Sequence, residues 1–438
     1  MLKRFIRHRN KELGLVELVA IALGGMVGGG IFSILGISVE YIGNATPVAI
    51  LIGGILALFA AHAYIKLTGL YKDEGATYSF FKKTFPSATF ASAGIGWLVV
   101  FGYISTLALY AFTFSSYFCS QFAALNNPTG HAGIAGAVLL LFTILNLVSV
   151  KGMGMVEDWL VYIKLVILLF ISGLLAGKGQ IQHIEPLIEP GTSFSAILTV
   201  AAITFVAYEG FQLVIHAYHE VDDPDRNIPK AIYCAIVIAL LLYVGLAVGT
   251  LVSVPKQTII DGKEYALASG ASQYLGPLGL VIVIFGALLA TSSAISGTLF
   301  GASRLMAVIA EDGYLPRFLS HRIKGHIPTN AIILMAVLAF VLILSGGLQL
   351  ILEFGSITFI LVSFLMAYSN FKVRKQTHTS SVVAIVSMLG LFVAGVLILY
   401  LEYTKEMDQL YAIGAVYAVL ILGAWLYSRK NKPHEPGN

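Results

Sequence analysis

The sequence predicts an all-α integral membrane protein with 12 transmembrane helices, and three observations support this prediction. Hydrophobic residues make up 58% of the 438 residues and charged residues only 11%, against roughly 25% charged in ordinary soluble domains. The apolar residues come in runs of about 20, which is the length of a membrane-crossing helix, and not in the short alternating segments of a β-barrel. Backbone polar groups in hydrocarbon must be satisfied internally, which favours helices.

Twelve apolar runs divide the chain in order. They are 15–40, 46–68, 92–123, 132–150, 156–176, 194–218, 230–254, 274–308, 329–346, 348–370, 382–402 and 408–427. Only Ser345-Gly346-Gly347 separates the ninth from the tenth. With the N-terminus inside, 22 of the 27 Lys and Arg residues fall on the cytoplasmic side, four fall outside, and Lys164 lies within the fifth run. This asymmetry predicts that both termini are cytoplasmic.

The first run contains an unusual glycine-rich stretch, Leu23 to Phe32, with five glycines in ten residues. Each glycine costs a helix roughly 1 kcal/mol relative to alanine. A broken helix is tolerated at membrane depth only where it is packed in protein or lines a cavity, and transporters use the freed N–H and C=O groups to bind ions and substrates. A small-residue contact between packed helices is the alternative reading.

The sixth run carries Tyr208-Glu209-Gly210 near its middle. The first and sixth runs occupy corresponding places if the chain consists of two inverted halves of five helices followed by two extra helices. Interrupted segments at matching places in two halves indicate a transport site. We therefore expect helices 1 and 6 to be unwound in mid-membrane.

Two ionisable residues lie inside predicted spans. Lys164 is flanked by apolar residues on both sides, and such a residue is a candidate proton or charge relay because its insertion costs roughly 3 kcal/mol or more. A lysine that reaches the inner surface is the alternative. Glu209 could hold a substrate ammonium, carry a proton or pair with Lys164, or it could be a protonated carboxyl satisfied by freed backbone.

Other features carry less information. The hydroxyls of Ser292, Ser293 and Ser296 could ligate sodium but more often bond to their own helix. The candidate pocket walls are the aromatic residues Phe32, Tyr103, Tyr208 and Phe211.

The sequence predicts no metal site, cofactor, nucleic-acid partner, disulfide framework or removed signal peptide. We also predict that the protein is not an enzyme, because Lys164 with Glu209 is the only candidate catalytic pair in the sequence.

Four stretches together resemble the amino acid–polyamine–organocation (APC) transporter superfamily over essentially the whole chain. They are the glycine stretch 23–32, Phe205 to Phe211, the acidic loop His219 to Ile232 with its Arg226-Asn227-Ile228-Pro229, and Ser303 to Pro316. The resemblance is greatest to prokaryotic proton-coupled amino acid transporters. It implies a LeuT-type fold with a core at 1–370, made of repeats 15–176 and 194–370, then two accessory helices at 382–427 and a cytoplasmic tail at 428–438.

The resemblance also implies roles for individual residues. Lys164 matches the helix-five lysine that couples transport to protons, which makes Ser292, Ser293 and Ser296 neighbours of an ammonium. The N–H groups of the glycines would hold the substrate carboxylate, carbonyls of helices 1 and 6 its ammonium, and Thr106 would border the side-chain pocket. The implied substrate-binding residues are Met26, Gly28, Gly29, Gly30, Thr106, Val206, Tyr208 and Glu209.

Two positions depart from the family pattern. Gly29 replaces a hydroxyl residue, and Glu209 stands where an apolar residue is usual, which admits cationic amino acids or amines. The resulting expectation is a proton-coupled amino acid importer of a prokaryotic cytoplasmic membrane, in lipid, as monomer or homodimer. An exchanger or polyamine transporter on the same fold, and a sensor that binds without transport, remain alternatives.

Overall fold

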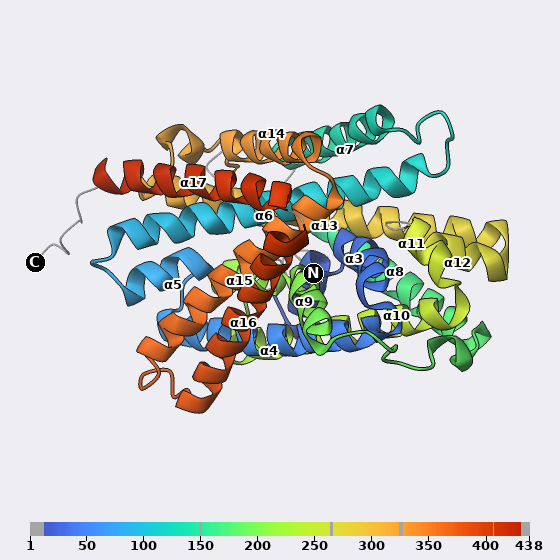
Figure 1. The fold of residues 1–438 in the computed structure, drawn as a ribbon. Coiled ribbons are helices and arrows are strands. Elements are labelled where there is room, and N and C mark those ends of the chain that lie inside the picture. The colour runs from blue at the N-terminus through green and yellow to red at the C-terminus, as the bar shows by residue number, and fades with distance from the viewer. Residues whose placement is uncertain (1–12, 149–150, 263–265, 324–326, 406, 431–438) are drawn as a thin grey trace, which may run out of the picture.

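The computed structural model describes residues 13–148, 151–262, 266–323, 327–405 and 407–430, and its architecture is helical throughout (Figure 1). Among these residues, β-pairing is limited to two isolated bridges, Leu13 with Val221 and Ile323 with Ile327.

Helices occupy every one of the 12 predicted apolar runs. The first run forms α2 (Leu15–Met26) and α3 (Gly29–Ile42), and the sixth forms α9 (Phe194–Thr204) with the 3₁₀ segments η3 (Phe205–Tyr208) and η4 (Phe211–Glu220). The other ten are α4 (Thr46–Tyr71), α6 (Thr89–Cys119), α7 (Pro128–Val148), α8 (Lys151–Lys178), α10 (Pro224–Ser253), α13 (Pro277–Glu311), α14 (Thr329–Ser345), α15 (Leu348–Lys372), α16 (Ser381–Lys405) and α17 (Met407–Lys430).

Ten segments of the described chain are long and apolar enough to cross a membrane, and one of them is the run Gly29–Tyr71, which joins α3 to α4. Two further apolar helices, α2 and α14, are shorter. The predicted division between the ninth and tenth runs is confirmed, since α14 ends at Ser345 and α15 begins at Leu348.

Short helices lie at the two ends of the bundle. Helix α5 (Ala76–Thr84) lies at one end, and α11 (Lys256–Gly262) with α12 (Ala266–Leu275) lies at the other (Figure 1). We call these the α5 end and the α11 end.

At the α5 end, polar contacts join segments that are distant in sequence. The Tyr78 hydroxyl donates to Asp312 Oδ2 at 2.6 Å, and Lys82 Nζ donates to the same oxygen at 2.8 Å. Burial and this bond to Asp312 raise the pKa of Tyr78, so the phenol stays protonated and keeps donating. A second link joins Lys72 to Asp225 at 2.7 Å. These contacts tie α5 and the end of α4 to α13 and α10.

The interior is formed mainly by α2, α6, α10 and α13. Helix α6 packs along α13, and α10 packs against α8, α4 and α2. Small residues such as Ala290 and Ala294 of α13 are fully buried and allow close packing. By contrast, α16 and α17 expose large apolar residues, including Val382 and Tyr411, which suits a surface in contact with lipid. The two helix interruptions thus lie among the interior helices and away from the surface that α16 and α17 form.

Candidate substrate and coupling site

The interruption in the first run falls at Val27 and Gly28. Helix α2 ends at Met26, Gly28 takes an extended conformation (φ −118°, ψ −139°), and α3 begins at Gly29. The glycine stretch thus breaks the helix as the sequence predicts. The last carbonyls of α2 and the first N–H groups of α3 lose their helical partners at such a break.

Lys164 satisfies two of the freed carbonyls. Its side chain is fully buried, and Nζ donates to the carbonyl oxygens of Gly24 at 3.1 Å and Val27 at 2.7 Å. A third bond runs to Ser293 Oγ at 2.8 Å. One ammonium therefore connects α8 with the broken end of α2 and with the middle of α13. The alternative of a lysine reaching the surface does not hold in this structure.

Two tyrosines satisfy the remaining carbonyls of α2. Tyr110 of α6 donates to the Gly25 carbonyl at 2.8 Å. Tyr243 of α10 places its hydroxyl 2.8 Å from the Met26 carbonyl and 3.1 Å from that of Ala207. Because Met26 belongs to the first break and Ala207 to the second, one phenol holds the two interruptions together.

The second interruption lies between η3 and η4. Glu209 is extended (φ −71°, ψ 145°) and Gly210 has a φ of +119°, a value that L side chains rarely adopt. The backbone then continues as 3₁₀ rather than α-helix to Glu220. The second half of this span is therefore more tightly wound than an ordinary helix.

The two interruptions touch through glycine. A Cβ on Gly210 would lie 2.5 Å from the Gly25 carbonyl carbon, and a Cβ on Gly25 would lie 3.2 Å from the Gly210 Cα. Backbone packs on backbone here, so the glycine stretch both breaks the helix and forms a close packing contact.

The glycines that open α3 are enclosed by neighbouring helices. A Cβ on Gly28 would meet Ala294 at 2.7 Å, one on Gly29 would meet Thr113 Oγ1 at 2.7 Å, and one on Gly30 would lie 3.1 Å from the Ala207 Cα. Thr113 therefore places a hydroxyl from α6 close to the position where Gly29 lacks one. The N–H groups at a helix start attract anions, so this corner is suited to a carboxylate.

The other predicted site residues lie around the breaks, with differing contacts. Val206 accepts the Glu209 N–H at 3.2 Å. The Thr106 hydroxyl donates to the Tyr103 carbonyl of its own helix at 2.9 Å. Tyr208 points away from the glycines and donates to the Ile50 carbonyl of α4 at 2.8 Å. Its hydroxyl therefore joins helices and does not face the first break.

The three serines of α13 differ in position. Ser293 bonds Lys164, Ser296 is buried with a hydroxyl that contacts no described acceptor or donor, and Ser292 is only partly buried. Of these three serines, Ser293 is the one with a described bond to the ammonium. Among the described residues, no cluster of three or more His, Cys, Asp or Glu side chains could hold a metal ion.

All four predicted wall aromatics are buried and paired with a second ring. The pairs and their centroid distances are Phe32 with Tyr117 (5.4 Å), Phe211 with Tyr64 (5.4 Å), Tyr103 with Phe359 (5.6 Å) and Tyr208 with Tyr243 (5.3 Å).

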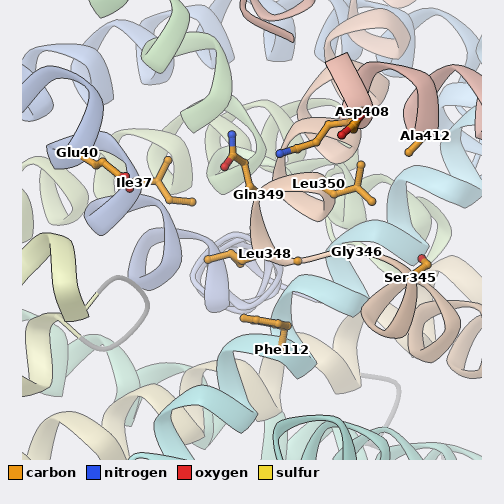
Figure 2. Close-up of a pocket in the computed structure, with 12 residues that line it drawn as sticks. Ile37, Glu40, Phe112, Ser345, Gly346, Leu348, Gln349, Leu350, Asp408 and Ala412 are labelled. Atoms are coloured by element: carbon orange, nitrogen blue, oxygen red, sulfur yellow. The ribbon is translucent and has the colours of Figure 1, made fainter. Parts of the chain in front are cut away.

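A cavity of about 550 Å³ lies beside the second half of α3, the helix that packs against α11 (Figure 2). It is lined by α3, α6, the α14–α15 connection and α17, with Glu40, Gln349 and Asp408 as polar groups. Ile37 in its wall lies eight residues after Gly29, or about 12 Å along α3. The cavity is therefore separate from the Lys164 contacts, but it lies along α3, the helix that begins at the first interruption.

Some functional contacts are not evident from the sequence. In the sequence, nothing distinguishes Tyr110, Thr113 and Tyr243 from other polar residues of long spans. Only the fold shows that these three residues face the breaks. The available signal was weak, since a hydroxyl in a span most often bonds to its own helix. Thr113 does both, because it also donates to the Leu109 carbonyl at 2.8 Å.

Comparisons with known proteins agree with this architecture. A family model described as "Amino acid permease" matches residues 13–425. The Inner membrane transport protein YbaT of Escherichia coli is 30% identical over 423 residues, which cover 96% of this chain and 95% of YbaT. The Aromatic amino acid transport protein AroP of Corynebacterium glutamicum is 25% identical, covering 93% of this chain and 92% of AroP.

A solved structure shares the fold. The manganese transporter of Eremococcus coleocola superposes with a TM-score of 0.64 at 13% identity and covers 97% of this chain and 96% of its own. The matched family and these relatives are membrane transporters and not enzymes. The family match over nearly the whole chain shows that this multi-pass membrane protein belongs to the amino acid permease family.

Proposed function

We propose that the protein takes up amino acids into the cell by proton-coupled symport with alternating access. The observation that carries the proposal is the position of Lys164, whose ammonium bonds both the broken end of α2 and Ser293 of α13. A protonated amine has three donors and a neutral amine has two. Loss of the proton therefore weakens the link between α8, α2 and α13.

This difference can drive a transport cycle. A ligand shifts a conformational equilibrium only through its different affinities for the two states. A proton on Lys164 favours the state in which α2 is held against α8 and α13, and its release favours the state in which α2 separates from them. Movement of α2 opens one side of the site, because α2 leads from the break to the α5 end.

The substrate would lie at the two interruptions. The N–H groups of Gly28, Gly29 and Gly30 would bind the α-carboxylate, in keeping with the preference of helix starts for anions. Carbonyls of Met26, Val206 and Glu209 would receive the α-ammonium. Thr106 would border the side chain, while Tyr208 would support the site by fixing η3 to α4.

The proposal includes a membrane topology. Twelve crossings in a LeuT-type arrangement, with repeats 15–176 and 194–370 and accessory helices 382–427, would place the α5 end and both termini in the cytoplasm. The Lys and Arg residues concentrate in the loops of the α5 end, as expected for a cytoplasmic face. The cavity beside α3, the helix that packs against α11, would then be an entrance from outside.

Uptake into proteoliposomes tests the proposed function. An inward proton gradient should concentrate a radiolabelled amino acid pool inside the vesicles, and an inward sodium gradient without a proton gradient should not. Saturable binding without accumulation would indicate a sensor instead of a transporter. Accumulation driven by sodium would contradict the assigned role of Lys164 and would move the coupling site to the hydroxyls of α13.

A further inference from the structure

The side chain of Glu209 has an unused acceptor inside the protein. Glu209 is 2% exposed and lies between η3 and η4. Its Oε2 accepts a hydrogen bond from Gln212 Nε2 at 2.6 Å, whereas Oε1 contacts no donor of the described chain. A buried polar atom without a partner is costly, and it therefore points to a ligand or to a second state.

Gln212 fixes one oxygen of the Glu209 carboxyl. The Gly210 N–H donates to Gln212 Oε1 at 3.1 Å, so the oxygen end of the amide faces the backbone. The NH₂ end must then face Glu209. The Glu209 Oε2 atom accepts this N–H whether the carboxyl is ionised or protonated. Gln212 thus holds Oε2 in place and leaves Oε1 as the oxygen available to a ligand.

No cation of the described chain pairs with Glu209. Lys164 directs its described bonds at Gly24, Val27 and Ser293, and Glu209 takes part in no ion pair among the described residues. The pairing of Lys164 with Glu209 that the sequence allows is therefore not formed here. Burial disfavours the ionised form of an unpaired carboxyl, so a positive group from outside the chain would stabilise that form and pair with it.

Three tyrosines lie in the neighbourhood of Glu209. They are Tyr64, Tyr103 and Tyr110. Tyr103 is 3% exposed, and its hydroxyl lies beside Gln212 without a partner at good hydrogen-bonding geometry in the described chain. A carboxylate oxygen and a phenol oxygen together offer two acceptors to an ammonium group.

We infer that Glu209 Oε1 and the Tyr103 hydroxyl bind an ammonium group of the substrate, and that Gln212 orients the carboxylate. This inference rests on the amino acid transport proposed above. The negatively charged side chain, and not backbone carbonyls alone, then recognises the amine. The ammonium can be that of a cationic side chain or the α-ammonium itself. Substrates without an ammonium group are rejected because they leave a buried carboxylate unpaired.

Uptake kinetics of Glu209→Gln with three probes test the inference. L-Lysine carries both ammonium groups, L-norleucine lacks the side-chain ammonium at nearly the same shape, and cadaverine lacks the carboxylate. Glu209→Gln should raise the KM for at least one transported probe by tenfold or more. If only lysine and cadaverine lose affinity, the side-chain ammonium is bound, and if norleucine loses it equally, the α-ammonium is bound. Tyr103→Phe should raise the KM for the same probes by a smaller factor.

Glu402→Gln is the matched control, because Glu402 is also fully buried but lies on α16, away from the interruptions. It should leave all three KM values within twofold. If Glu209→Gln and Tyr103→Phe both transport with the KM values of the wild type, the inference is wrong, but the proposed amino acid transport still stands. Failure of the wild type to transport any amino acid would instead overturn the proposed function and, with it, this inference.

Discussion

Lys164→Ala is expected to reduce proton-driven accumulation to the level measured without a proton gradient, a loss of at least about tenfold. The substitution removes the ammonium that bonds Gly24, Val27 and Ser293. Each hydrogen bond to a charged group contributes about 1.5–3 kcal/mol, and 1.4 kcal/mol corresponds to a factor of ten. The variant should also lose the pH dependence of uptake, since the residue that binds the coupling proton is gone. Uptake of labelled substrate over a range of external pH measures both effects.

A pair of serine variants separates this role from general damage to the core. Ser293→Ala removes one described partner of the ammonium and should weaken proton-driven uptake severalfold. Ser292→Ala changes the adjacent, partly exposed residue, which has no described bond to Lys164, and should behave as wild type. Undiminished, pH-dependent accumulation by Lys164→Ala would contradict the coupling role of this lysine.

Gly210→Ala is expected to abolish transport and to destabilise the fold by about 3 kcal/mol or more. Two costs add: a φ of +119° is strained for alanine, and overpacking of a filled interior typically costs about 1–3 kcal/mol. The new Cβ would lie 2.5 Å from the Gly25 carbonyl carbon and 2.8 Å from the Met26 nitrogen. Because backbone atoms are rigidly held, relief requires the two interruptions to separate. Thermal unfolding in detergent and substrate uptake measure the effects.

Gly173→Ala is the matched control. Gly173 lies in α8, and a Cβ there would have nothing within 4 Å. Alanine is the better helix former by about 1 kcal/mol, so this variant should be as stable as the wild type or slightly more stable. Normal uptake and stability in Gly210→Ala would show that the close contact between the two interruptions is not required.

Helix positions were predictable because hydrocarbon imposes a simple rule on the chain. A span must be long, apolar and internally hydrogen-bonded, and the structure places helices in all 12 runs. The first interruption was also predictable, because the glycines at 28–30 weaken a helix locally. The division between the ninth and tenth runs was also predictable, because Ser345-Gly346-Gly347 contains no strong helix former.

The partners of the interruptions could not be predicted in the same way. The sequence identifies Lys164 as a buried charge, but only the fold shows that Tyr110 and Tyr243 take the neighbouring carbonyls. These contacts depend on the rotation of α6 and α10 about their axes. Both helices are apolar on most sides, so periodicity does not determine which face points inward. For the same reason, the sequence does not show that the Tyr208 hydroxyl bonds the Ile50 carbonyl of α4.

Internal acidification of proteoliposomes upon addition of amino acid tests the central claim most directly. Vesicles containing the wild-type protein and a trapped pH indicator, with no imposed ion gradient, receive an amino acid mixture outside. Coupled symport through Lys164 predicts that the vesicle interior acidifies as substrate enters, and that Lys164→Ala vesicles do not acidify. Substrate entry into wild-type vesicles without any change in internal pH would contradict proton coupling.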